Sequence, residues 1–353
     1  MQRAPRRYWA LIMRIFVNTN YDFLRWRWHA IIVSWIIILA GIGLMIKRGG
    51  PPLGIDFSGG TIVIVEFDKS TPEDVVRNAL DPVSTDKIVQ EYGDPAQHRV
   101  MVRLPQVKTG TEQGFALESG AKQIADALTK ANVGHFTIVS QEVVGPIVGE
   151  ELKSKGIWAT VFSIIGIGIY VWFRFRFSFA MGASIATVHD ILITLSFLVF
   201  FNYELSLNII AAILTIAGYS VNDTIVVFDR VRENLHLTRR ETLDKVINDS
   251  VNQTLGRTVI TSTTTFLAVL SLYLFGGEVL RGFAFTMLVG IVTGTYSTVF
   301  IASSVAVLIG NRQAMAMKGA AKPIGASSTA KQPAVTSGSK VSSGSNKAQR
   351  KRA

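Results

Sequence analysis

Residues 205–228 read LSLNIIAAILTIAGYSVNDTIVVF, an apolar run interrupted by a single charged side chain, Asp223. A helix of about 20 apolar residues, rising 1.5 Å per residue, spans the hydrocarbon core of a bilayer. A carboxylate near the middle of such a helix costs about 2.5 to 3.5 kcal/mol on insertion scales, so it should face protein or water. The run therefore predicts a membrane-spanning helix that carries a candidate functional carboxylate.

Comparable apolar runs make this a membrane protein. The chain has 353 residues, of which 48% are hydrophobic and 17% charged, whereas an average soluble domain is about 25% charged. Besides 205–228, spans are predicted at 29–46, 157–173, 179–201, 259–275 and 282–310. No small-residue cleavage pattern follows the first run, which we read as a retained anchor. The composition argues against an ordinary soluble enzyme.

Basic residues in the short connections predict the orientation of these six spans. Lys and Arg resist translocation, so they gather in cytoplasmic loops. With both termini on one side, that side holds the basic residues of 1–28, of the loop 229–258 and of the tail. The short loops opposite hold one, Arg281. We expect both termini to be cytoplasmic, with the long segment 47–156 outside the cytoplasm.

The segment 47–156 has the mixed polarity of a soluble domain. Strand patterns at 61–67, 87–92, 99–104 and 136–144 alternate with helical patterns that end near residue 80 and cover 117–131. The order βαββαβ predicts a ferredoxin-like α+β domain with two helices on one face of an antiparallel sheet. Whether this domain is a spacer or binds a partner stays open, because a fold does not decide function.

Most of the net positive charge lies in the C-terminal tail. The formal net charge is +11, and residues 311–353 contribute nine positive charges and no negative ones. This Ser- and Lys-rich tail is predicted to be disordered, and it either solubilises the chain or attracts anionic membrane lipid. The rest is near neutral, which argues against binding nucleic acid. With no cysteine present, disulfides and thiolate metal sites are excluded.

The candidate site lies where ionisable groups enter the apolar runs. Asp223 and Arg257 both fall toward the cytoplasmic ends of their spans and could meet, and Thr261 lies one turn beyond Arg257 on the same helix face. Burial favours the neutral form of a carboxyl, whereas a neighbouring Arg favours the charged form. An aspartate under both influences can exchange protons near neutral pH. The alternative is a fixed Asp–Arg pair that only pins two helices together.

Asp190 is a weaker candidate for the same proton pathway. It lies near the middle of the third span with no basic partner evident in another span. A hydrogen-bonded or protonated carboxyl with a structural role would explain it equally well. We read its neighbour His189 as a packing residue, since adjacent helix positions do not share a face. A cytoplasmic helix is also predicted to open at Thr238, with the spacing of a capping box to Glu241.

Signatures of enzymes, metals and cofactors do not occur in the sequence. It has no HExxH, GxxxxGK[ST] or GxSxG motif, and its five histidines are scattered. The glycines of GIDFSGG (54–60) are followed by a strand rather than a helix, so we read this segment as a turn-rich entry to the outer domain. The chain is therefore not expected to be an enzyme, and protons are its only expected coupling ion.

Several motifs in order resemble the SecF family of bacterial protein export. They are GIDFSGGT (54–61), VGPIVGEEL (144–152), VHD (188–190), GYSVNDTIVVFDRVREN (218–234) and GRTVITS (256–262). The resemblance runs over about residues 25–310 and leaves the tail uncovered. It implies six spans forming half of an RND-like bundle, with Asp223, Arg257 and Thr261 as proton-pathway residues.

The resemblance also implies partners and a location. These are SecD, the SecYEG channel, commonly YajC and YidC, and exported preproteins at the bacterial inner membrane, with the proton motive force completing translocation after channel passage. Two other functions remain open. One is an RND-type small-molecule transporter subunit, and the other is a scaffold that only stabilises SecD.

Overall fold

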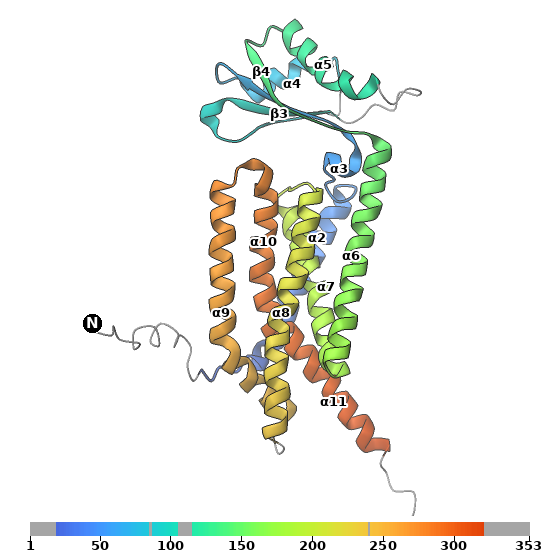
Figure 1. Cartoon of the computed structure of the whole chain (residues 1–353), viewed down its shortest axis with the longest axis vertical. Coiled ribbons are helices and arrows are strands. Elements are labelled where there is room, and N and C mark those ends of the chain that lie inside the picture. Colours follow the sequence, from blue (N-terminus) through green and yellow to red (C-terminus); the bar gives the residue numbers. More distant parts are fainter. Residues whose placement is uncertain (1–18, 85–86, 105–114, 239–240, 321–353) are drawn as a thin grey trace, which may run out of the picture. The chain divides into compact units, whose positions relative to one another are not determined.

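The computed structural model describes residues 19–84, 87–104, 115–238 and 241–320. These ranges contain six helices long and apolar enough to cross a membrane, as predicted. The first five are α2 (Arg27–Lys47), entered through a 3-10 turn at Leu24–Trp26, and α6 (Pro146–Arg174), α7 (Phe177–Phe200), α8 (Leu207–Leu237) and α9 (Leu243–Phe275). The sixth span combines α10 (Glu278–Ser297), a π-helical segment η3 (Thr298–Ala302) and α11 (Ser303–Ala320) (Figure 1).

Several helices extend beyond the apolar runs that predicted them. The connection 229–258 was expected to contain a separate cytoplasmic helix, but α8 continues to Leu237, and α9 begins at Leu243 and runs unbroken into the fifth span. The capping prediction at Thr238 is wrong, because the hydroxyl of Thr242 instead accepts the Lys245 amide at 3.4 Å. Likewise α11 continues to Ala320, and the rest of the basic tail lies outside the described residues. Hydropathy marks where a helix leaves the hydrocarbon, whereas hydrogen bonds and caps decide where it ends.

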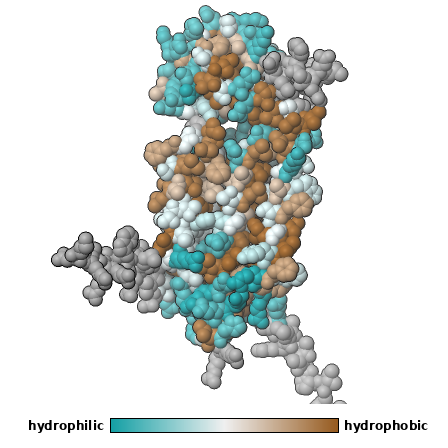
Figure 2. All heavy atoms as spheres, viewed as in Figure 1, coloured by the Kyte–Doolittle hydropathy of each residue, from teal (hydrophilic) through white to brown (hydrophobic). Residues whose placement is uncertain are grey.

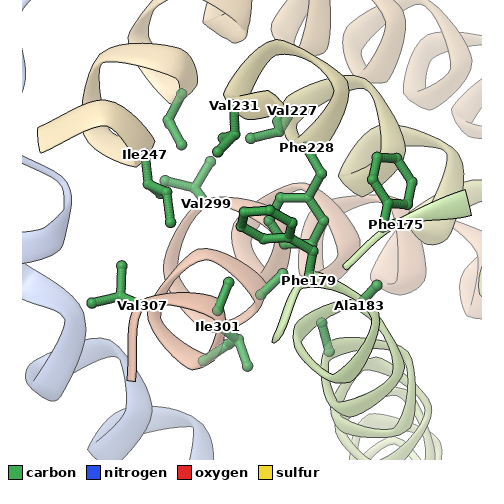
Figure 3. Packing of buried hydrophobic residues seen from close by; sticks show 14 of the residues in the cluster. Phe175, Phe179, Ala183, Val227, Phe228, Val231, Ile247, Val299, Ile301 and Val307 are labelled. Atoms are coloured by element: carbon green, nitrogen blue, oxygen red, sulfur yellow. The ribbon is translucent and has the colours of Figure 1, made fainter. Parts of the chain in front are cut away.

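Helix α8 packs against four other helices of the bundle, α6, α7, α9 and α10. Its fully buried Phe228 contacts Phe175 and Phe179, with ring centroids 6.2 Å and 5.1 Å away (Figure 3). By contrast, α6 and α9 bury little of their surface within the chain. Figure 2 shows hydrophobic side chains over the flanks of the helices and hydrophilic ones beyond their ends. This distribution suits helices surrounded by lipid or by another membrane protein.

Residues 60–144 form a small α+β domain, called here the sheet domain. Its strands are β1 (Gly60–Phe67), β2 (Ile88–Glu91), β3 (Arg99–Leu104) and β4 (Phe136–Val144), antiparallel in the order β2-β3-β1-β4. Helices α4 (Glu73–Ala79) and α5 (Phe115–Lys130) cover one face (Figure 1), and a 3-10 turn at Pro95–Gln97 precedes β3. The order βαββαβ confirms the predicted ferredoxin-like arrangement.

Alternation along the strands builds the core of the sheet domain. Val63 and Val65 of β1 point to the same side and are fully buried, as side chains two residues apart on a strand should be. They pack with Val102 of β3 and with Ile124 and Leu128 of α5. The segment before β1, predicted as a turn, contains one helical turn, α3 (Ile55–Ser58).

Candidate buried-carboxylate site

Asp223 is held in the middle of the bundle by one hydrogen bond. It lies on α8 and is 8% exposed. Its Oδ1 accepts the Thr258 hydroxyl of α9 at 2.8 Å, whereas its buried Oδ2 has no hydrogen-bond partner among the described residues. Most buried polar atoms in proteins are paired, so a carboxylate with one free oxygen is unusual. That oxygen is available to a proton or to a donor from another molecule.

Thr258, the residue that contacts Asp223, is absent from the sequence-based predictions. It belongs to a buried stripe on α9 with Thr254 and Ser262, spaced four residues apart. The Ser262 hydroxyl lies 2.7 Å from that of Thr295 and so links α9 to α10. Hydroxyl residues four apart share a helix face, so this spacing could have identified Thr258.

Arg257 and Thr261 lie on the other side of α9, exposed in the single chain. Within the described residues Arg257 forms no ion pair with Asp223, so the contact that the sequence allowed is not made in the single chain. The hydroxyl of Thr261 donates to the carbonyls of Arg257 and Thr258, both at 3.0 Å. Since Thr258 faces α8, the adjacent Arg257 is turned away by about 100° around the helix axis.

Asp190 of α7 occupies a fully buried and fully hydrogen-bonded position. Its Oδ2 accepts the hydroxyls of Ser220 on α8 at 2.5 Å and Ser297 on α10 at 2.7 Å. Its Oδ1 lies 2.9 Å from His189 Nδ1. Asp190 thereby joins three helices, which fits the structural alternative considered for it.

His189 is more than the packing residue that its position predicts. Adjacent residues do not share a helix face, but the imidazole is long enough to turn toward the next side chain and reach its carboxyl. Its second nitrogen, Nε2, is buried without a hydrogen-bond partner in the part of the chain that the structure describes. The pair Asp190–His189 therefore has one satisfied end and one open end.

A π-helical segment lies beside both aspartates. It begins at Thr298, directly after Ser297, and the hydroxyls of Thr298 and Thr224 lie 2.9 Å apart. Thr224 follows Asp223 on α8, so hydroxyl groups from the sixth span reach the helix of each carboxylate. Such π-segments inside α-helices often occur at functional sites. Among the described residues there is no cluster of three or more His, Cys, Asp or Glu side chains that could hold a metal ion.

Two family matches cover parts of the chain. One begins within α5 and ends within α11, and the other includes α3 and β1. Residues 123–312 match the family described as protein export membrane protein SecD/SecF, C-terminal, and residues 49–71 match the SecD/SecF GG motif. The chain belongs to the SecF family. It is accordingly a membrane protein, and the resemblance found in the sequence is confirmed.

Relatives and solved structures agree with this assignment. Over 296 residues the chain is 41% identical to the protein translocase subunit SecF of Calditerrivibrio nitroreducens, covering 83% of this chain and 95% of that one. Identity to SecF of Escherichia coli O157:H7 is 39% over 294 residues, covering 83% and 89%.

A crystal structure of SecDF from Thermus thermophilus, a translocon-associated membrane protein, matches with a TM-score of 0.73 and 31% identity. The match covers 84% of this chain but 39% of the SecDF chain. SecDF in a super-membrane-facing form matches at a TM-score of 0.63 and 32% identity, covering 86% and 41%. This chain therefore corresponds to about two fifths of a SecDF chain.

Proposed function

We propose that the chain is a SecF subunit that works with SecD to complete preprotein translocation, driven by the proton motive force. The observation that carries the proposal is Asp223, buried in the bundle with one carboxyl oxygen bonded and the other free. A charge crossing the membrane gains about 2.3 kcal/mol per 100 mV. Each unit of pH difference adds about 1.4 kcal/mol. These energies are large enough to bias a conformational equilibrium of a few kcal/mol.

The geometry at Asp223 suits reversible proton binding. A proton can join Oδ2 without displacing the hydrogen bond from Thr258 to Oδ1. The carboxylate and the carboxylic acid can therefore occupy the same position. Asp190 differs, because both of its oxygens already have hydrogen-bond partners. We assign Asp223 the main role in the pathway and Asp190 a secondary one.

Uncovered polar side chains support pairing with a second bundle. On α8 the exposed positions follow a helical stripe of small or polar residues, namely Ala211, Thr215, Gly218 and Asn222. On α9 a matching stripe contains Arg257, Thr261 and Thr264. Guanidinium and amide groups are unfavourable in lipid, whereas small residues allow helices to approach closely. SecD is the proposed partner, completing a twelve-helix core in which Arg257 and Thr261 line the proton pathway.

The proposal includes a location, partners and a chemical role. The basic bias of the short loops supports an inner-membrane protein with both termini in the cytoplasm and the sheet domain outside. The SecYEG channel, YajC, YidC and exported preproteins are the proposed partners beyond SecD. Protons are the proposed coupling ion, and covalent catalysis is not part of the proposed role.

The test is reconstitution of the complex with SecD and the channel in vesicles under an imposed proton gradient. We expect Asp223→Asn and Arg257→Met to assemble normally but to lose proton flux and completion of translocation. Unchanged flux and translocation in both variants would contradict the proposal and favour a scaffold. Flux stimulated by small apolar molecules, without an effect on preproteins, would favour a transporter subunit.

A further inference from the structure

The sheet domain and the two aspartates lie on different parts of the chain. The domain is inserted between α2 and α6, whereas Asp190 and Asp223 lie on α7 and α8. Movement of α8 therefore has no short covalent route to the sheet. Any direct transmission must pass through non-covalent contacts, and hydrogen bonds and an ion pair reach the loop between α7 and α8 from the sheet and from the segment that precedes it.

The segment before β1 is hydrogen-bonded to this loop. The Gly54 amide donates to the Leu205 carbonyl, and the Leu205 amide donates to the Pro52 carbonyl, each at 2.7 Å. Asp56, the second residue of α3, also contacts this region, since its Oδ2 accepts the amide of Leu207 at 2.8 Å. Leu207 is the first residue of α8, so a carboxylate from the other segment caps the helix that carries Asp223. Both the hydrogen bond and the helix dipole favour a carboxylate at this end.

Arg103 fastens the sheet to the same place. It lies on β3, its side chain is 10% exposed, and its guanidinium forms an ion pair with Glu204 of the loop. The guanidinium also donates to the Leu53 carbonyl at 2.9 Å and to the Ser58 hydroxyl at 2.7 Å. A planar guanidinium with several donors fixes three groups at once, which a lysine could not do with the same geometry.

The two covalent connections of the sheet domain, before β1 and after β4, are less tightly packed than this contact. Gly49 and Gly50, after α2, have φ angles of +82° and +140°, which side chains larger than hydrogen disfavour. Gly145, before α6, has open space where a Cβ atom would lie. In contrast, a Cβ on Gly54 would lie 2.7 Å from the Leu205 carbonyl oxygen. A side chain would therefore find space at the two covalent connections and none at Gly54, and α3 also packs against α6.

We propose that residues 52–58 and Arg103, bound to residues 204–207, form a joint that stays closed while the sheet domain moves together with α8. Arg103 and Asp56 are positioning residues in this joint. The inference rests on the proposed function, because it identifies how proton exchange at Asp223 would move the outer domain. Gly49 and Gly50 provide the hinge that allows this motion relative to α2, whereas α3 packs against α6, so the adjoining end of α6 moves with the joint.

Opening the joint should uncouple proton flux from translocation. In the reconstituted complex we expect Gly54→Ala, which inserts a methyl group against Leu205, to slow translocation at least fivefold with proton flux within twofold of wild type. Gly145→Ala is the matched control, since it makes the same change in open space. Asp56→Asn, which keeps an oxygen for the Leu207 amide, should retain more translocation than Asp56→Ala.

Locking the joint gives the complementary test. Because the chain contains no cysteine, Leu53→Cys with Leu205→Cys introduces a single pair at residues joined by a parallel β-bridge. We expect the oxidised pair to translocate within twofold of the reduced pair. Inhibition by the disulfide that reductant reverses would mean that the joint must open, and would overturn the inference.

Two further results would also overturn it. Gly54→Ala could translocate as wild type, or it could lose proton flux together with translocation, which would indicate a role in assembly alone. Failure of the proposed function itself looks different. In that case Asp223→Asn, introduced into a chain with an unaltered joint, would show the proton flux and translocation of the wild type.

Discussion

Asp190 and Asp223 are two buried carboxylates in one bundle, but their surroundings differ. Asp190 receives two hydroxyl hydrogen bonds and contacts an imidazole, so its neighbours fix it in place. Asp223 receives one hydroxyl hydrogen bond and keeps one oxygen free. Burial alone therefore does not distinguish a structural carboxyl from one that can work. The number of satisfied oxygens separates the two, and four substitutions test this difference.

The largest effect is expected for Asp223→Asn. It removes the group that takes up the proton while preserving its size, so proton flux should fall at least about a hundredfold, as when a proton-transfer group is lost elsewhere. Flux measured in vesicles with a pH-sensitive dye checks this result. Asp190→Asn is the matched control on the neighbouring helix, and an equal loss of flux there would erase the distinction.

Asp190→Ala should mainly affect stability. The change leaves the hydroxyls of Ser220 and Ser297 and the imidazole of His189 without their shared partner. Unpaired buried donors cost about 1 to 3 kcal/mol each, so we expect the free energy of unfolding to fall by about 3 kcal/mol. Denaturant titration in detergent micelles measures this quantity. No loss of stability would indicate that Asp190 is not the fixed member of the comparison.

Thr258→Val should have an intermediate effect on flux. Valine has the shape of threonine but cannot donate to Asp223 Oδ1, and loss of a hydrogen bond to a charged group is worth about 1.5 kcal/mol or more. A change of 1.4 kcal/mol is about tenfold, so flux should fall by about that factor. Thr258→Ser, which keeps the hydroxyl, should stay close to wild type. If valine and serine behave alike, the hydrogen bond does not position the carboxyl.

Thr261→Val should have the smallest effect. Its hydroxyl bonds to carbonyls of its own helix and its side chain is exposed in the single chain. Exposed substitutions usually change stability by less than about 0.5 kcal/mol, so the fold should be unaffected, and we expect flux to fall by about twofold because the hydroxyl only lines the proposed pathway. Flux equal to that of the wild type in the vesicle assay would remove this hydroxyl from the pathway proposed with the partner.

Much of the fold could be predicted because apolar length and strand alternation are local signals. The six spans and the βαββαβ order follow from these signals. The end of α8 at Leu237 does not, because the last turns of this helix lie beyond the apolar run. Of the site, Asp190 and Asp223 stand out as charges among apolar residues. Thr258 does not stand out by itself, because only its four-residue spacing from Thr254 and Ser262 distinguishes it among the many hydroxyl residues of α9.

Contacts between segments that lie far apart in the sequence could not be predicted from it. A hydrogen bond between backbone groups joins Gly54 to Leu205. Because every residue carries the same backbone groups, no sequence pattern indicates which two will pair. The contact of His189 with Asp190 depends on a side-chain rotamer rather than on helix spacing. By their places in the sequence Arg257 and Asp223 could meet, but the direction of Arg257 in the single chain is set by the neighbouring Thr258, which faces α8.

The most direct measurement is infrared difference spectroscopy on the assembled complex in vesicles while a proton gradient is applied and removed. We predict a carboxyl C=O band that appears with proton binding and vanishes with release, absent in Asp223→Asn and retained in Asp190→Asn. A spectrum without this band in the wild-type complex, during measured proton-driven translocation, would contradict a working role for Asp223.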